Sequence, residues 1–514
     1  MSIKQYRPWA PDQPYLLPPS PREWLPPDHL AFFILDVVSK LDLSAIEAPI
    51  HAKDPRGVRP YPPQLMVALL LYSYCTGTFS SRKIERNTYE DLGTRVIGGE
   101  EHPDHSTFAG FRKTHLEALG SLFAQVVQLA ATVGLVKLGR VAIDGTRVQA
   151  NASKHKAMSY DRMTKKKEQL QAQIAELLDR AKAVDEEEDA IYGEDGYRDL
   201  PKELERRESR LAAIEEAMRQ LEAGARAARA AELDAQAANH EAKAADESRS
   251  ATDRKRSGTL ARKRRDKANS LRDEGNDDDP PPSAPADETP LPLDAVETTE
   301  DTPADEPAPD AFPERSVRHT ADGRPHDRAQ YNFTDPDSQI LEDKGGFVQG
   351  YNCQVATNEE HIVVGLGVTN VAPDTHHLRG VLENVHDTCG EFPDKALADG
   401  GYWAEENAAY CEDNGVDVYI SMGREGKSAR QESASGKDPP TPNAAMRQKM
   451  AAPEARDIYR ARKWMVEAPI GQIKEAMGFR RFLLRGLQAV SEEWALVCTA
   501  HNLLKIWRHG AAVS

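Results

Sequence analysis

The stretch GRVAIDGTRVQANASK, residues 139–154, contains a short apolar run that ends at Asp144 and is broken by Gly145. A compact apolar run followed by glycine predicts a buried strand and then a turn. The stretch DKALADGGYW, residues 394–403, repeats this pattern around Asp399. Each acid is therefore expected at the carboxyl end of its own strand.

Further strands and helices are predicted around the second acid. The order along the chain is strand, strand, strand, helix, strand, helix, strand, helix, with a long insertion after the first strand. The strands are residues 141–144, 347–358, 361–371, the stretch DKALADGG at 394–401, and 416–422, and the helices are 375–389, 404–415 and a C-terminal one. This order predicts an α/β fold with an RNase H-like mixed sheet. Because adjacent strand ends bring distant side chains together, Asp144 and Asp399 are expected to meet.

A third acid, Glu467, lies in RKWMVEAPIGQIKEAMGFRRF, residues 462–482, where the pattern predicts a helix. Three carboxylates from separate elements would hold two Mg²⁺ ions about 4 Å apart, with Mn²⁺ as the alternative. For a single acid, a turn cap or a solvent-facing position is the more common role. Pro469 lacks an N–H, so the helix is expected either to begin near Glu467 or to be kinked there.

Basic residues follow this acid along the chain. Lys474 comes seven residues after Glu467, about two helical turns, so both are expected on roughly the same face. Arg480, Arg481 and Arg485 extend the basic stretch and are candidates for contacting phosphate. Ordinary surface charge is the alternative for each of them.

Residues 1–134 are predicted to form an all-helical N-terminal domain, because apolar residues recur there at helical spacing. Pro62 and Pro63 mark one helix start, and Ser106 or Thr107 is expected to cap a long helix. A short helix after Ser80 or Ser81 carries Arg82 and Lys83. A helix-turn-helix-like DNA-binding role and a solvated basic face are the two interpretations of that helix.

Residues 157–234 are predicted to form an inserted antiparallel coiled-coil hairpin. Apolar residues alternate steps of four and three in both halves of this segment. They are Leu170, Ile174, Leu177, Ala181 and Val184 in the first half, and Leu211, Ile214, Met218 and Leu221 in the second. Residues 235–325, basic and then acidic and Pro-rich, are expected to be largely disordered, since neither block builds a core.

The charge of the chain is distributed unevenly. Residues 273–310 hold 14 acidic residues and no Lys or Arg, so subtracting them from the net charge of −17 leaves about −3 elsewhere. A local basic surface is compatible with that balance. The five cysteines show no metal-ligand spacing, and no stretch approaches the roughly 18 apolar residues of a membrane span. A cytoplasmic location is expected.

Several motifs together resemble DDE transposases of bacterial insertion sequences, nearest the 1182 group of the insertion-sequence-4-like superfamily. They are PDHSTFAGFRKTH, VAIDGTRVQANASK, NFTDPDSQI, GGFVQGYNCQVATN, LADGGYW and RKWMVEAPIGQIKEAMGFRRFLLRG. The resemblance implies a catalytic domain split between residues 135–156 and 326–514. It implies that Asp144, Asp399 and Glu467 form a catalytic, metal-binding triad.

The superfamily's Tyr, Arg, Glu, Lys signature maps less cleanly onto the chain. Glu467 and Lys474 fit its spacing, but its Arg position falls on Lys463 and its Tyr position on Arg460, with Tyr459 one residue earlier. Lys463 is therefore a further candidate DNA contact. The resemblance implies cleavage and joining of double-stranded DNA by a nucleoid-associated protein, with a homodimer on DNA as one assembly. A nuclease that only hydrolyses and an inactive DNA-binding coiled-coil protein are the alternatives.

Overall fold

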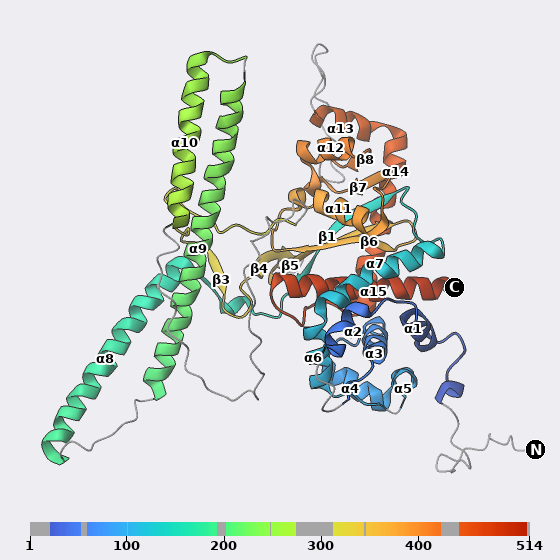
Figure 1. Cartoon of the computed structure of the whole chain (residues 1–514), viewed down its shortest axis with the longest axis horizontal. Coiled ribbons are helices and arrows are strands. Elements are labelled where there is room, and N and C mark those ends of the chain that lie inside the picture. The colour runs from blue at the N-terminus through green and yellow to red at the C-terminus, as the bar shows by residue number, and fades with distance from the viewer. Residues whose placement is uncertain are drawn as a thin grey trace, which may run out of the picture. The chain divides into compact units, whose positions relative to one another are not determined.

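The computed structural model describes residues 21–52, 59–99, 101–192, 202–246, 248–273, 312–343, 346–422 and 442–510. The chain divides into two compact units, Met1–Asn151 with Gly350–Ser514, and Ala152–Gln349 (Figure 1). The helical N-terminal region and the sheet, expected as separate domains, thus belong to one unit. The reason is helix α15, Leu487–His509, which packs on N-terminal helices and on the sheet and is buried along most of its length.

The N-terminal region is helical, as predicted. Its helices are α1 Leu30–Val38, α2 Ser44–His51, α3 Pro63–Cys75, α4 Ser81–Glu90, α5 Leu92–Gly98, α6 His105–Thr114 and α7 Leu116–Thr132, after a 3-10 turn at Pro21–Trp24. The expected long helix after residue 106 is two helices that meet at His115. Its cap is Asp104, whose Oδ1 accepts a 2.7 Å hydrogen bond from the Thr107 amide, and not Ser106 or Thr107.

A six-stranded mixed sheet confirms the predicted α/β class. Its strands are β1 Val141–Gln149, β4 Gln339–Asp343, β5 Gly346–Asn358, β6 Val363–Thr369, β7 Lys395–Ala398 and β8 Asp417–Ile420. The order is β4-β5-β1-β7-β8, with β6 paired to β5. β1 runs antiparallel to β5 and parallel to β7, and β7 runs parallel to β8.

Helices cover this sheet. Helices α11, Leu378–Cys389, and α15 pack against β6, while α14, Pro453–Gly471, packs against β1 (Figure 1). The helix α12, Glu405–Asp413, precedes β8. A five-residue π-helical turn, Gln472–Ala476, directly follows α14.

The polar, Pro-containing sequence from residue 423 to about 453 predicts a loop, but it contains a helix, α13, Pro442–Ala451, so that prediction is wrong for the part that the structure describes. The segment is polar, but its polar groups have partners. Asn443 Oδ1 accepts a 2.7 Å hydrogen bond from Trp403 Nε1, and Lys449 Nζ donates to the Val418 carbonyl at 2.6 Å. Residues 423–441 lie outside the described residues.

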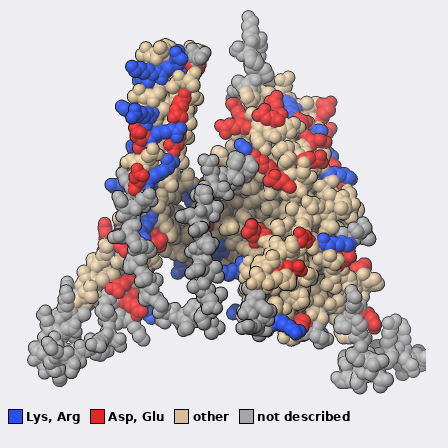
Figure 2. Space-filling view, viewed as in Figure 1, with Lys and Arg blue, Asp and Glu red and all other residues tan. Residues whose placement is uncertain are grey.

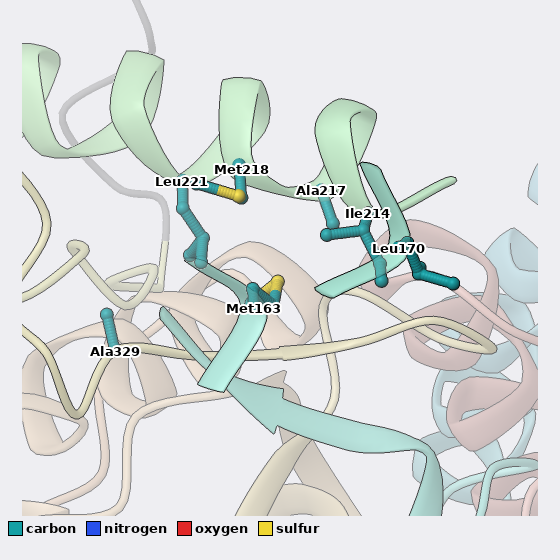
Figure 3. Close-up of a cluster of buried hydrophobic side chains, with 7 residues drawn as sticks. All are labelled: Met163, Leu170, Ile214, Ala217, Met218, Leu221 and Ala329. Atoms are coloured by element: carbon teal, nitrogen blue, oxygen red, sulfur yellow. The ribbon is translucent and has the colours of Figure 1, made fainter. Parts of the chain in front are cut away.

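The second unit carries the insertion. It contains α8 Tyr160–Tyr192, α9 Lys202–Ala245, α10 Ala251–Asp273 and a small sheet of β2 Ala157–Ser159 with β3 Gln330–Asn332. Met163 and Leu170 of α8 pack against Ile214, Met218 and Leu221 of α9 (Figure 3). The helices therefore run antiparallel, as predicted; a coiled coil in the strict sense stays a prediction, and its connecting turn, 193–201, lies outside the described residues.

The expected disorder after residue 235 is wrong for the described part of that segment. Helix α9 continues to Ala245, and α10 packs against it through Ala230, Leu233, Ala268 and Leu271. Alanine contributes little apolar area, but its small side chain lets two helices approach closely. The alanine-rich composition therefore gave no sign of a core, although a small apolar interface holds the two helices together. Residues 274–311, which include nearly all of the acidic block, lie outside the described residues.

Candidate active site

Strand pairing places two of the predicted acids side by side. In the parallel pair of β1 and β7, Val141 is opposite Ala396 and Ala142 is opposite Leu397. Continuing this register by two residues brings Asp144 opposite Asp399, just beyond the last residue of β7. The sequence prediction that the two strand-terminal acids are neighbours is thus met by the sheet.

Tight turns fix both carboxylates. Asp399 caps the short 3-10 turn Gly400–Tyr402, and its Oδ1 accepts a 2.8 Å hydrogen bond from the Gly401 amide. Asp144 Oδ1 accepts one of the same length from the Gly145 amide. A Cβ on Gly145 would lie 2.7 Å from Gln354 Nε2, so any larger residue there would displace the Gln354 amide.

A third aspartate, Asp374, lies at this edge, and sequence reasoning missed it. Its Oδ1 accepts hydrogen bonds from Asn352 Nδ2 at 2.8 Å and Gln354 Nε2 at 3.1 Å. Arg147 Nη1 lies 3.6 Å from the same oxygen. Asp374 begins a short 3-10 turn, Asp374–His376, after β6, and the signal that would have found it is the pair of amides, Asn352 and Gln354, at alternate positions of the buried strand β5.

The three aspartates influence one another. Burial raises the pKa of Asp144 to about 6, Arg462 opposes that rise, and the charges of Asp399 and Asp374 add to it. The pKa of the fully buried Tyr402 hydroxyl is raised well above its usual range, by burial first and then by Asp374, Asp144 and Asp399. Tyr402 donates its hydroxyl proton to Gln354 Oε1, which ties this tyrosine to the amides that hold Asp374.

Arg462 is a second residue of the site that sequence reasoning missed. Its Nη1 lies 3.2 Å from Asp144 Oδ2, and its guanidinium lies 5.8 Å from the ring centre of Tyr459. Signature spacing had pointed instead to Lys463, which is exposed. Arg462 lies on the face of α14 that packs toward β1, so helix periodicity rather than a fixed motif distance would have identified it.

Glu467 is not gathered with the aspartates. It is exposed on α14, whereas Val466 and Pro469 beside it are buried. The helix does not begin near Glu467, because α14 starts at Pro453 and runs through Pro469. Proline at 469 leaves the Met465 carbonyl without its usual helical donor, and Thr357 Oγ1 donates to that carbonyl at 2.9 Å. The π-helical turn then follows within two residues.

The aspartates suit a hard divalent cation, which prefers carboxylate oxygens. Their mutual repulsion, and the ion pair of Asp144 with Arg462, indicate a site that favours positive charge. Within the described ranges, however, no group of three or more His, Cys, Asp or Glu side chains is arranged to hold a metal ion. Asp144 and Asp399 therefore fit as two of the ligands, and the third is not in place.

Three of the predicted basic residues lie beside the end of β1. Lys474 Nζ donates to the Arg147 carbonyl at 2.7 Å. Arg481 Nη2 donates to Asn151 Oδ1 at 3.2 Å, and Arg485 Nε to the Asn151 carbonyl at 3.1 Å. The loop between them is held by the buried Glu493, which accepts hydrogen bonds from the Leu483 and Leu484 amides.

The remaining candidates are exposed. Arg480 pairs with Glu475, and Arg82 and Lys83 lie on the outer side of α4. The NFTDPDS motif forms a turn, because Asn332 Oδ1 accepts from the Thr334 amide at 2.9 Å. A side-chain-to-backbone bond of this kind is ordinary turn chemistry.

Two family models match the chain. One, described as a transposase DDE domain, matches residues 319–503, and the other, described as a transposase domain (DUF772), matches residues 19–114. Together they take in more than half of the chain, which belongs to the DDE transposases of insertion sequences. No match was found among curated proteins or among solved structures.

The matched ranges contain Asp399 and Glu467 but not Asp144. Asp144 is therefore assigned to the site by its position in the sheet, because neither family model covers it.

No helix among the described residues is long and apolar enough to cross a membrane.

Proposed function

We propose that this transposase cuts double-stranded DNA at the ends of its element and joins the freed 3′ hydroxyl to a target phosphate. The observation that carries the proposal is the β1–β7 register, which supports a shared role for Asp144 and Asp399. The order of antiparallel and then parallel strands supports an RNase H-like catalytic domain. The motifs favour the 1182 group of such enzymes.

Asp144 and Asp399 would hold the divalent cations, Mg²⁺ or Mn²⁺, with Glu467 as the third ligand. Bound cations supply activation of the attacking oxygen and stabilisation of the leaving oxygen. Asp374, held by two buried amides, keeps further negative charge beside this pair. No side chain needs to form a covalent intermediate, because water or a DNA hydroxyl is the nucleophile.

Arg462 would keep the site together before a cation arrives. Its guanidinium offsets the charge of Asp144, which is otherwise raised in energy by burial and by two neighbouring aspartates. Delivery of Glu467 to the site requires a change in α14, and the π-helical turn after it is a place where a helix changes its register. Such a change would also replace the Arg462–Asp144 contact.

Lys463, Lys474, Arg480, Arg481 and Arg485, together with Arg82 and Lys83, are proposed to contact DNA phosphates. Four of them, Lys474, Arg480, Arg481 and Arg485, lie at the end of β1 or in the loop beside it. Such contacts position the duplex but do not read its sequence. Two ends must be brought together, so a homodimer on DNA is proposed. A cytoplasmic, nucleoid-associated location follows from this substrate.

The test uses DNA that carries the flanking inverted repeats, with Mg²⁺, and maps the nicked strand. Asp144→Asn and Asp399→Asn should each lower cleavage by about 1000-fold, because several kcal/mol of charge stabilisation is lost. End binding, measured in EDTA, should stay within a few-fold of wild type. Near-normal cutting by both variants would contradict the proposal.

A second assay separates the transposase from a nuclease that only hydrolyses. A precleaved end with a free 3′ hydroxyl is supplied together with a plasmid target. Joined products are expected from the transposase. Cleavage of intact ends without joined products would favour hydrolysis alone, and binding with no cutting in any divalent cation would favour an inactive DNA-binding protein.

A further inference from the structure

Helix α10 carries a strong positive charge that the site at the sheet edge does not use. Its 23 residues contain nine Lys or Arg and three Asp. Figure 2 shows Lys and Arg gathered along the α10 side of the hairpin that α9 and α10 form. These cations fall into two sets, those that bind side chains of α9 and those that do not.

One set of cations faces α9 and stabilises the hairpin. Arg265 binds Glu241 through two bonds, of 2.9 and 3.0 Å, and Arg272 pairs with Asp234. Arg264 donates to Gln236. Together with the buried Ala268 and Leu271, these contacts define the side of α10 that packs on its partner.

A second set has no such structural role. No ion pair or side-chain hydrogen bond engages Lys255, Arg256, Arg262 or Lys263 within the described part of the chain, and all four are exposed. They form two adjacent pairs seven residues apart, so they share one face of the helix. Ala261, Ala268 and Leu271 point the other way, toward α9. We call the four residues the outer cationic face.

This face has the dimensions of a phosphate-binding surface. Seven residues of helix advance about 10 Å, which is about three base pairs along one DNA strand. The only acid on the face is Asp266, so its balance is clearly positive.

We propose that the outer cationic face of α10 binds the phosphate backbone of duplex DNA and that the insertion is a DNA-holding arm. The inference rests on the proposed function only in that the protein acts on DNA. Because these contacts would be to phosphates, they add affinity without sequence preference. The hairpin explains why the cations of α10 fall into two sets. Acidic residues of α9 neutralise the cations that face α9, and the cations of the outer face stay unneutralised.

The experiment measures DNA binding by the full chain in EDTA, so that no cutting occurs. The outer-face variant replaces all four cations: Lys255→Gln, Arg256→Gln, Arg262→Gln and Lys263→Gln. Fluorescence anisotropy is recorded with labelled duplexes, one carrying an element end and one of random sequence, between about 50 and 200 mM salt.

The outer-face variant should bind both duplexes at least about tenfold more weakly at 100 mM salt. Its plot of log affinity against log salt should be shallower by about 3.6, since each of the four phosphate contacts contributes about 0.9 to the slope. Circular dichroism should show unchanged helix content, because none of the four side chains supports the hairpin.

A matched variant removes four exposed cations from α8 and α9 of the same unit: Arg162→Gln, Lys165→Gln, Arg206→Gln and Arg210→Gln. It should bind DNA with a nearly unchanged salt slope. Equal losses in both variants would overturn the assignment of this face, as would an outer-face variant that binds like wild type. If the wild-type protein binds neither duplex, the proposed function itself fails.

Discussion

The predicted acids on the strands are held in position by hydrogen bonds between the strands, whereas the predicted acid on the helix is held by the packing of that helix. Asp144 and Asp399 extend from a parallel strand pair, whose hydrogen bonds fix their relative position to within a residue. Glu467 is carried by α14, which is held to β1 by side-chain packing. A rotation of that helix moves every side chain on it, so a helix-borne ligand depends on tertiary contacts that strand-borne ligands do not need.

The largest expected effect tests whether α14 completes the site when DNA and metal bind. Glu467→Gln should lower cleavage by about 1000-fold, as much as Asp399→Asn, if the helix delivers its carboxylate. Cleavage is measured on end DNA with Mg²⁺. Glu454→Gln, an exposed acid of the same helix, serves as the control and should cut normally. Activity of Glu467→Gln within tenfold of wild type would exclude it from the triad.

The next largest effect concerns Asp374, which hydrogen bonds from two side chains of strand β5 hold in place. Asp374→Asn should lower cleavage by about 10- to 100-fold, the usual cost of losing a group that supports metal ligands. The apparent affinity for Mn²⁺, titrated through cleavage rate, should fall by a similar factor. Asp387→Asn, an exposed acid on α11, should match wild type. A loss as great as that of Asp399→Asn would make Asp374 a direct ligand.

The pH dependence of stability tests the raised pKa of Asp144, which burial causes first and the charges of Asp399 and Asp374 increase. The folded-state pKa of Asp144 is raised to about 6. The folded protein therefore keeps a proton that the unfolded chain releases from about pH 4, and stability falls as pH rises from 4 to 6. Asp144→Asn should remove about 2 kcal/mol of that fall, measured by urea unfolding in EDTA.

Glu492 and Glu493, whose pKa values are each raised to about 7 by burial first, act in the same direction. The wild-type curve therefore contains their contributions as well. Subtracting the pH curve of unfolding free energy of Asp144→Asn from that of wild type removes these contributions and leaves that of Asp144. Parallel curves for the two proteins would show that folding does not raise the pKa of Asp144.

The smallest effect concerns the anchoring of α14 to the sheet. Thr357→Val removes the donor to the Met465 carbonyl and should cost about 1 kcal/mol of unfolding free energy. In a Pro469→Ala background the cost should shrink, because the new amide at 469 donates to the same carbonyl. Urea unfolding of the four proteins of this cycle gives the coupling. Additive costs would mean that the threonine does not replace the missing helical bond.

The sequence predicted the parts of the fold that depend on local pattern. Short apolar runs ending in Asp-Gly marked β1 and β7, and helical spacing marked α1, α3 and α11. It missed α13, because the partners of Asn443 and Lys449 lie far away along the chain. It also missed α10, because the sequence there is rich in charged residues and alanine, as in many disordered segments. The contacts that hold this helix, small apolar side chains and ion pairs with α9, appear only in the structure.

By itself, the sequence determined that two acids end strands and that a third stands on a helix, because each depends on neighbouring residues alone. Only the tertiary structure decided which acids meet. Register between β1 and β7 joined Asp144 to Asp399, two buried amides of β5 drew in Asp374, and the packing of α14 turned Arg462 toward Asp144 while leaving Glu467 exposed. Those outcomes depend on contacts between residues that are from 20 to 318 positions apart, which no local pattern encodes.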